Sequence, residues 1–117
     1  MTPTTISVFN LVGNSFCVEA NDGDSVFAAI SKALHQDQAV ELSFQNVEML
    51  TSAFLNTAIG QLYGIFSEEK IRALVKVADM DKVDQALLRR VIETAKSYYQ
   101  DPARLDASVK QIMGEDA

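Results

Sequence analysis

Apolar and polar positions alternate in four parts of the chain, and this alternation predicts four β-strands. The first two strands are predicted over residues 5–11 and 16–20, joined as a hairpin by a turn at Gly13. The third and fourth are predicted over residues 39–44 and 71–77, where β-branched and aliphatic residues recur. The pattern therefore begins with two paired strands and continues with two single ones.

Between the strands, apolar residues recur every three or four positions, which predicts amphipathic helices. The first helix is expected to begin at Asp24 or Ser25, after a polar break at residues 21–24. The second is expected to begin at Thr51 or Ser52, because a hydroxyl residue precedes a broad apolar face. Gly60 and Gly64 lie on one face of this second helix, and we expect close packing there against the sheet.

Two more helices are predicted in the last third of the chain. One runs from about residue 78 to residue 99 and ends before Pro102. The other covers about residues 103–113. The order of elements predicts an α/β domain with a mixed β-sheet of about four strands and helices packed on it. A chain of 117 residues without a long linker is expected to form a single domain, with its core at about residues 5–99.

Composition and charge narrow the classes of protein that this domain can represent. Hydrophobic residues make up 48% of the chain, which suits a packed core, and a lone cysteine excludes an intramolecular disulfide. No apolar run is long enough to cross a membrane, and the start of the chain does not resemble a signal peptide, so a cytoplasmic protein is expected. The net charge is −6, and residues 1–66 hold six acids but one base, which argues against binding nucleic acid.

Few residues in the chain suit catalytic chemistry. Cys17 lies in a predicted strand, where a buried small side chain is the expected role, and His35 lies at a predicted helix end. One cysteine and one histidine are too few for a structural zinc site. The acids Asp22 and Asp24 resemble a fragment of a calcium loop, but a turn followed by a helix cap is the expected interpretation. We therefore expect a protein that is not an enzyme and needs no metal or cofactor.

The most informative segment is residues 39–56, AVELSFQNVEMLTSAFLN. A strand of the form V-x-L-x-F is followed by N-V-E, then by a hydroxyl pair and an apolar helix. This segment resembles the centre of the STAS domain of bacterial anti-sigma factor antagonists. It is closer to an uncharacterised branch, the STAS-like proteins, and the resemblance spans roughly residues 5–99. The additional helix at residues 103–113 would extend the usual fold.

The resemblance implies a regulatory module that binds another protein, with a histidine-kinase-like ATPase as one type of partner. In the antagonists, the second serine of an Asp-Ser-Ser-Gly motif at this helix start is phosphorylated. Ala53 occupies that position here, so either Ser52 or Thr51 replaces it as acceptor, or both only cap the helix. The predicted partner-binding or phosphoacceptor residues are Thr51, Ser52, Asn56, Asp22 and Asp24.

The sequence also leaves two alternatives, one for the function and one for the packing of the last predicted helix. Relatives of the fold bind nucleotides or lipids, so a small-ligand sensor with a pocket beside the first strand is the alternative function. The apolar residues of the last predicted helix pack either on their own chain, which we expect, or on a second copy; the protein is accordingly expected to be a monomer or a weak homodimer. These apolar residues are Leu105, Val109, Ile112 and Met113.

Overall fold

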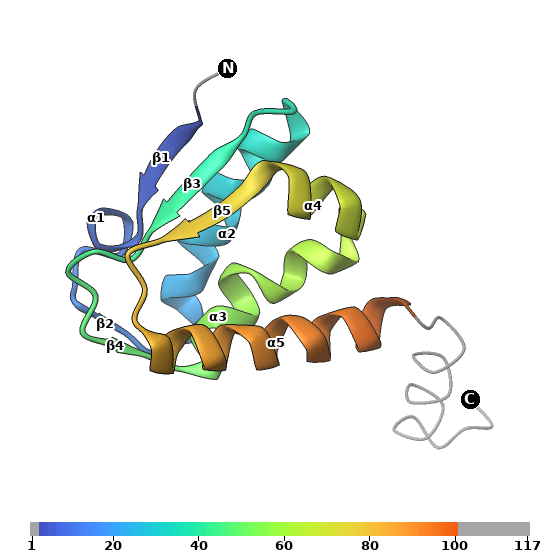
Figure 1. Ribbon diagram of the computed structural model, residues 1–117. Helices are drawn as coiled ribbons and strands as arrows, with labels where there is room; N and C mark the ends of the chain where they lie inside the picture. Colours follow the sequence, from blue (N-terminus) through green and yellow to red (C-terminus); the bar gives the residue numbers. More distant parts are fainter. Residues whose placement is uncertain (1–2, 101–117) are drawn as a thin grey trace.

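The computed structural model describes residues 3–100 and has a three-stranded parallel β-sheet at its centre (Figure 1). Its strands β1 (Thr4–Ser7), β3 (Val40–Ser43) and β5 (Val75–Ala78) are arranged in the order β1-β3-β5. Both neighbouring pairs are parallel and in register along all four residues of each strand. The α/β class predicted from the sequence is confirmed.

A second sheet consists of two short strands, β2 (Phe16–Cys17) and β4 (Met49–Leu50), which also pair in parallel. The predicted hairpin between residues 5–11 and 16–20 is therefore wrong, because the register partners of β2 lie 33 positions later in the sequence. The predicted mixed sheet is corrected for the same reason, since the strand pairs of the described chain are all parallel.

The predicted first strand is only half as long as expected. After β1 the chain turns into a short helix, α1 (Val8–Val12). The Ser7 hydroxyl accepts a hydrogen bond from the backbone N–H of Asn10 at 3.1 Å, which caps this helix. Gly13 ends it in the left-handed region at φ 77°, where a residue with a side chain would be strained. These two caps outweigh the β-branched composition that predicted a longer strand.

Helix α2 (Ala20–His35) begins earlier than the sequence predicted. The break expected at residues 21–24 is absent, and these residues form the first turns of the helix. Glu19 occupies the N-cap position without a side-chain hydrogen bond to the helix. Asp22 lies in the first turn, where a negative charge is favourable beside the positive end of the helix dipole.

Helix α3 (Ser52–Ala58) begins where the sequence predicted, and the 3₁₀-helix η1 (Gly60–Gly64) follows it. Both glycines approach the C-terminal helix, and not the sheet as expected. A Cβ atom at Gly60 would lie 3.7 Å from Cβ of Ala95, and one at Gly64 would lie 2.6 Å from the ring of Tyr99. Close packing was predicted correctly, but against the wrong partner.

The fourth predicted strand was placed too early. Helix α4 (Glu68–Leu74) occupies the first part of the range 71–77, and the strand β5 occupies the rest. The last described element is the long helix α5 (Lys82–Gln100), close to its predicted position. The helix predicted over residues 103–113 lies outside the described residues.

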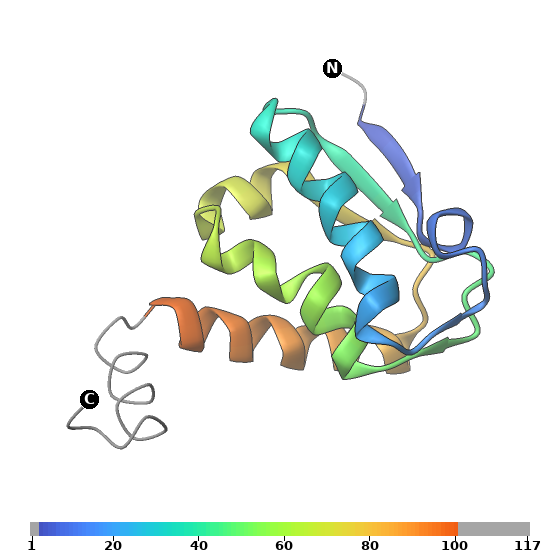
Figure 2. The same ribbon diagram turned by 180° about the vertical axis from the view of Figure 1, so that it is seen from behind.

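Helices cover one face of the central sheet, with α2 and α4 on the same side (Figures 1 and 2). On that side, Val40 and Leu42 of β3 are fully buried, whereas Glu41 between them is exposed on the other face. Glu41 lies in register with Thr5 and Lys76, and all three are exposed. A polar open face explains why the β3 sequence alternates, unlike strands of parallel sheets that are buried on both sides.

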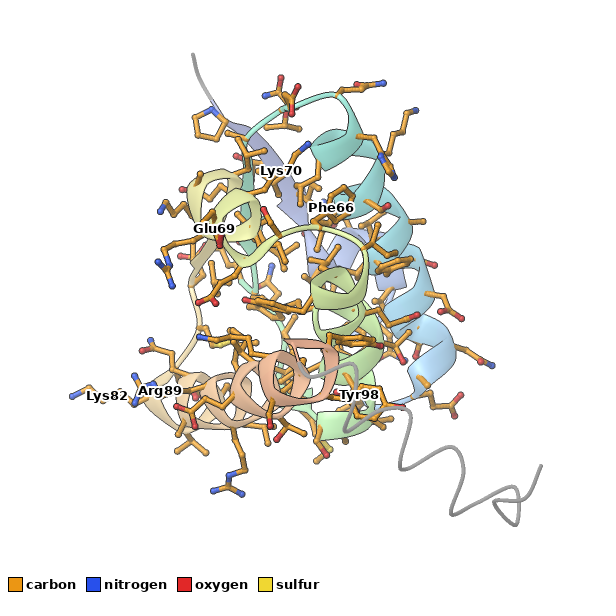
Figure 3. All side chains as sticks on the ribbon, turned by 90° about the vertical axis from the view of Figure 1, so that its right-hand side faces the viewer. Phe66, Glu69, Lys70, Lys82, Arg89 and Tyr98 are labelled. Carbon is orange, nitrogen blue, oxygen red and sulfur yellow. The ribbon has the colours of Figure 1, made fainter. Side chains whose placement is uncertain are left out.

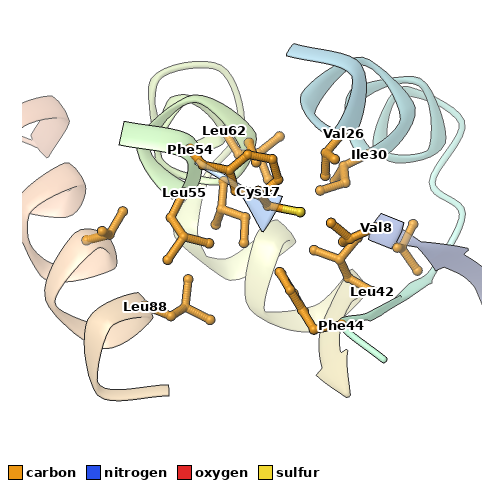
Figure 4. Close-up of a cluster of buried hydrophobic side chains, with 14 of the residues drawn as sticks. Val8, Cys17, Val26, Ile30, Leu42, Phe44, Phe54, Leu55, Leu62 and Leu88 are labelled. Carbon is orange, nitrogen blue, oxygen red and sulfur yellow. The ribbon is translucent and has the colours of Figure 1, made fainter. Parts of the chain in front are cut away.

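The core lies between the covered face of the sheet and the helices (Figure 4). Its fully buried side chains come from α1, β2, α2, β3, α3 and η1, so elements far apart in the sequence share it. Where β3 and β5 end, the buried Ser43 hydroxyl donates a 2.7 Å hydrogen bond to the Asp79 carboxylate. Asp79 has a positive φ of 61°, and this bond holds it beside the sheet.

Candidate functional site

The predicted site centres on the first turn of α3, where Thr51 has a structural role. Its hydroxyl accepts a hydrogen bond from the backbone N–H of Phe54 at 3.2 Å and donates one to the carbonyl of Val18 at 2.6 Å. The first bond caps α3, as the sequence predicted. The second fixes the start of α3 to the segment between β2 and α2. The side chain is partly buried.

Ser52, Ala53 and Asn56 form an exposed face on α3. Ser52 is the first residue of the helix, and Asn56 follows four positions later, so the two side chains lie on the same side of the helix. The neighbouring residues Phe54 and Leu55 are fully buried and hold this face in place. Of the two predicted hydroxyl acceptors, Ser52 is thus the one that is open to solvent.

Helix α2 brings Asp22 and Asp24 beside α3. Both helices follow strands of the same parallel pair, so their N-termini lie at the same end of the molecule (Figure 2). Gly23 sits at their contact, because a Cβ atom there would be 2.7 Å from the carbonyl oxygen of Phe54. Asp24 is exposed, whereas Asp22 is partly buried. The predicted site residues are therefore gathered on two adjoining helix starts.

The electrostatic character of this region is acidic. Glu19 and Asp24 are exposed at the start of α2, and Asp22 lies between them. The sequence holds one base, Lys32, within residues 1–66, and it lies in the last turn of α2. The start of α2 therefore carries three carboxylates, which favours contact with a basic surface. On the side of α5, Lys82 and Arg90 line a hollow together with Leu50, two residues before Ser52.

The sequence did not predict an exposed apolar pair next to these helix starts. Phe16 and Met49 are register partners in the small sheet, and their exposed fractions are 49% and 51%. Their neighbours Cys17 and Leu50 point to the other side of the sheet and are buried. Met49 lies three residues before Ser52, so the apolar pair is next to the start of α3. The alternation of apolar and polar residues did not reveal this pair. It predicts that residues 16–20 form a hairpin with residues 5–11, whereas Phe16 pairs with Met49.

Cys17 and His35 do not form a nucleophilic pair. Cys17 precedes α2 and His35 ends it, so about 24 Å of helix separates them. Burial, with a smaller effect of the Asp22 charge, raises the pKa of the Cys17 thiol to about 11, which keeps it protonated. The His35 ring packs on Phe66 with a centroid distance of 4.9 Å. Cys17 is the buried small side chain that the sequence predicted.

Within residues 3–100, no group of three or more His, Cys, Asp or Glu side chains is arranged to hold a metal ion. Nor is any helix in this part of the chain long and apolar enough to span a membrane.

The comparison with family models decides the identity of the fold. The model of the STAS-like domain of unknown function (DUF4325) matches residues 22–85, more than half of the chain. The chain belongs to this family. No similar protein was found among the curated proteins, and none among the solved structures.

The matched part of the STAS-like domain contains every predicted site residue. It runs from the first turn of α2 to the first turn of α5, and so includes both adjoining helix starts and Met49. The resemblance inferred from residues 39–56 is confirmed at the level of this family. Phe16 and most of α5 lie outside the matched residues.

Proposed function

We propose that this STAS-like domain is a non-catalytic regulatory module that binds a partner protein through the adjoining starts of α2 and α3. The observation that carries the proposal is the acidic and apolar surface around Ser52. We call it the α2–α3 surface and define it by Ser52, Asn56, Asp24, Phe16 and Met49.

The composition of the α2–α3 surface supports protein binding. Large exposed apolar side chains next to polar ones are typical of the centre and rim of protein interfaces. Phe16 and Met49 supply the apolar centre, and Asp24 and Asn56 supply the rim. The acidic rim calls for a basic patch on the partner. A regulatory ATPase of the histidine-kinase-like type is the partner class that the family resemblance suggests.

Phosphorylation of Ser52 would regulate this contact. The side chain is exposed at the first residue of α3, whereas the Thr51 hydroxyl is already engaged in two hydrogen bonds. A phosphate adds about −1.5 to −2 charges. Placed beside the acids of α2, it would add to the negative charge that the basic patch of the partner meets. We therefore expect phosphorylation of Ser52 to strengthen partner binding.

Affinity capture with the full chain tests the binding proposal. The bait is incubated with lysate of its native cells, with and without ATP and Mg²⁺, and bound proteins are identified by mass spectrometry. A partner that is captured by the wild type but lost with Asp24→Lys supports the proposal. Equal capture by both baits, or a small molecule retained on the bait with no protein partner, would contradict it; the second result would favour the ligand sensor.

Intact mass of the same bait tests the phosphorylation step. We expect a gain of one phosphate in the wild type and in the control Ser25→Ala, whose side chain is also exposed, on α2. The gain should disappear in Ser52→Ala. Thr51→Ala is unsuitable here, because it would also remove the helix cap. If the protein is never phosphorylated under these conditions, the proposed regulation through Ser52 is contradicted, whereas the proposed partner binding is not.

A further inference from the structure

An open groove runs between β5 and α5, on a different side of the molecule from the α2–α3 surface. Its larger part has a volume of about 440 Å³, and an adjoining part has about 210 Å³. Val77, Leu88, Ile92 and Lys96 line both parts, so the two form one continuous hollow. The first three of these residues give the groove an apolar floor.

The groove exists because α5 does not pack on the sheet. The helix contacts α3 and η1 instead, through Val91 and Ala95, which are 6% and 5% exposed. Strand β5 is the edge of the described sheet, and Val77 on it remains 38% exposed. An apolar edge strand beside a helix with a second apolar side normally calls for a further covering element.

We propose that residues 105–113 of the same chain cover this groove as a helix antiparallel to α5. Their apolar residues recur at intervals of four, three and one, which places them on one face of a helix. That face would lie on the groove floor, with Ile112 and Met113 near Ile92 and Leu88. The apolar residues concerned are Leu105, Val109, Ile112 and Met113.

The length of the chain suits this arrangement. Helix α5 ends at Gln100, one turn after Lys96 at the near end of the groove. Pro102 then favours a turn, and a connection of two to five residues is what antiparallel helix pairs use. A helix over residues 104–113 would be about 15 Å long, and the distance along α5 from Lys96 to Leu88 is about 12 Å. The segment therefore reaches the centre of the groove.

The net charge of residues 101–117 also agrees with their binding in the groove. The rim of the two parts together carries Arg72, Arg89 and Lys96 against Glu68 and Glu93, and Lys96 forms an ion pair with Glu68 at 2.9 Å. Residues 101–117 contain four acids and two bases, so they carry the opposite net charge. Arg89 projects from α5 into solvent, as does Lys82 on the same side (Figure 3). An approaching acidic segment would meet this basic side of the helix.

A spin label on the full chain tests the proposal. Cys17 is fully buried with a raised pKa, so it does not compete for the label, and Ser108→Cys provides the attachment site. We expect paramagnetic broadening of the methyl signals of Val77, Leu88 and Ile92. The broadening should fall severalfold when Ile112→Asp and Met113→Asp are added. It should persist with Ala107→Asp and Gln111→Asp, which add the same charge to the opposite helix face.

All of these variants have the same chain length, so the covalent connection alone brings the label equally close to the groove in each of them. A difference in broadening between them therefore reports contact of the apolar face with the groove. Equal broadening in the two double variants would overturn the proposal, as would its absence in the parent protein. Unlabelled, isotope-enriched protein is mixed with labelled protein as a last control. Broadening in that mixture would mean that a second copy fills the groove, and it would overturn the intramolecular arrangement.

Discussion

The Thr51 hydroxyl joins the start of α3 to the segment between β2 and α2 through two hydrogen bonds, and so it helps to position the α2–α3 surface. It was identified as a helix cap from its place before an apolar run, because the capping preference is local in sequence. Its bond to Val18 had no such signal, since the two residues are 33 positions apart. Residue-level prediction therefore succeeded for the cap and missed the long-range contact.

Replacing Thr51 by Val keeps the shape of the side chain and removes both hydrogen bonds. We expect the free energy of unfolding to fall by about 1–2 kcal/mol, because a helix cap is lost and the Val18 carbonyl loses its partner. Thr51→Ser keeps the hydroxyl and should lose less. Urea unfolding of the three proteins measures the difference. A Val variant as stable as the wild type would show that neither bond contributes.

The buried thiol of Cys17 predicts a loss of stability at high pH. Burial raises its pKa from 9.0 to about 11, so the folded protein holds the proton more tightly than the unfolded chain does. The stabilising effect is complete below pH 9 and is lost between pH 9 and about pH 11, at roughly 1.4 kcal/mol per pH unit. Urea unfolding across this range should show a steeper decline for the wild type than for Cys17→Ala. Parallel declines would contradict this assignment.

At the scale of elements, the order of strands and helices was largely predictable, but strand pairing was not. The strand at Val40–Ser43 and the helix starting at Ser52 follow from patterns within a few residues. The pairing of Phe16 with Met49 depends on how α2 packs against α3, which no local pattern contains. A hairpin was predicted in its place, and the apolar pair of the candidate site was missed with it.

The contact between α2 and α3 depends on Gly23. Alanine would gain about 1 kcal/mol in helix propensity, but its Cβ atom would lie 2.7 Å from the Phe54 carbonyl and 2.9 Å from the Thr57 Cβ. Both atoms are held by the α3 backbone, so the helices would have to move apart. Overpacking of this kind costs about 1–3 kcal/mol, and we expect a net loss of stability in Gly23→Ala.

Thermal unfolding measures this loss, with Ser25→Ala as the control on the exposed side of the same helix. The control should be unchanged or slightly more stable. A Gly23→Ala variant that gains stability would show that the two helices are not in the tight contact described here.

At the scale of the whole molecule, the arrangement explains how one small domain can present two separate surfaces. The α2–α3 surface lies at the end where both helices begin, whereas the groove lies between β5 and α5. The family was predictable from residues 39–56, because these residues form the central strand and the start of α3 together. The groove was not, since it arises from α5 packing against η1 through Gly60 and Gly64.

The affinity of the captured partner for variants of Phe16 and Met49 shows whether this apolar pair forms the centre of the interface. We expect Phe16→Ala combined with Met49→Ala to weaken binding about tenfold or more, because both side chains would leave the centre of the interface. Ile65→Ala is the matched control, since Ile65 is 54% exposed but lies after η1, away from this surface. Calorimetry that gives a tenfold loss of affinity in the double variant and none in the control would support binding through the α2–α3 surface. Unchanged binding by the double variant would contradict it.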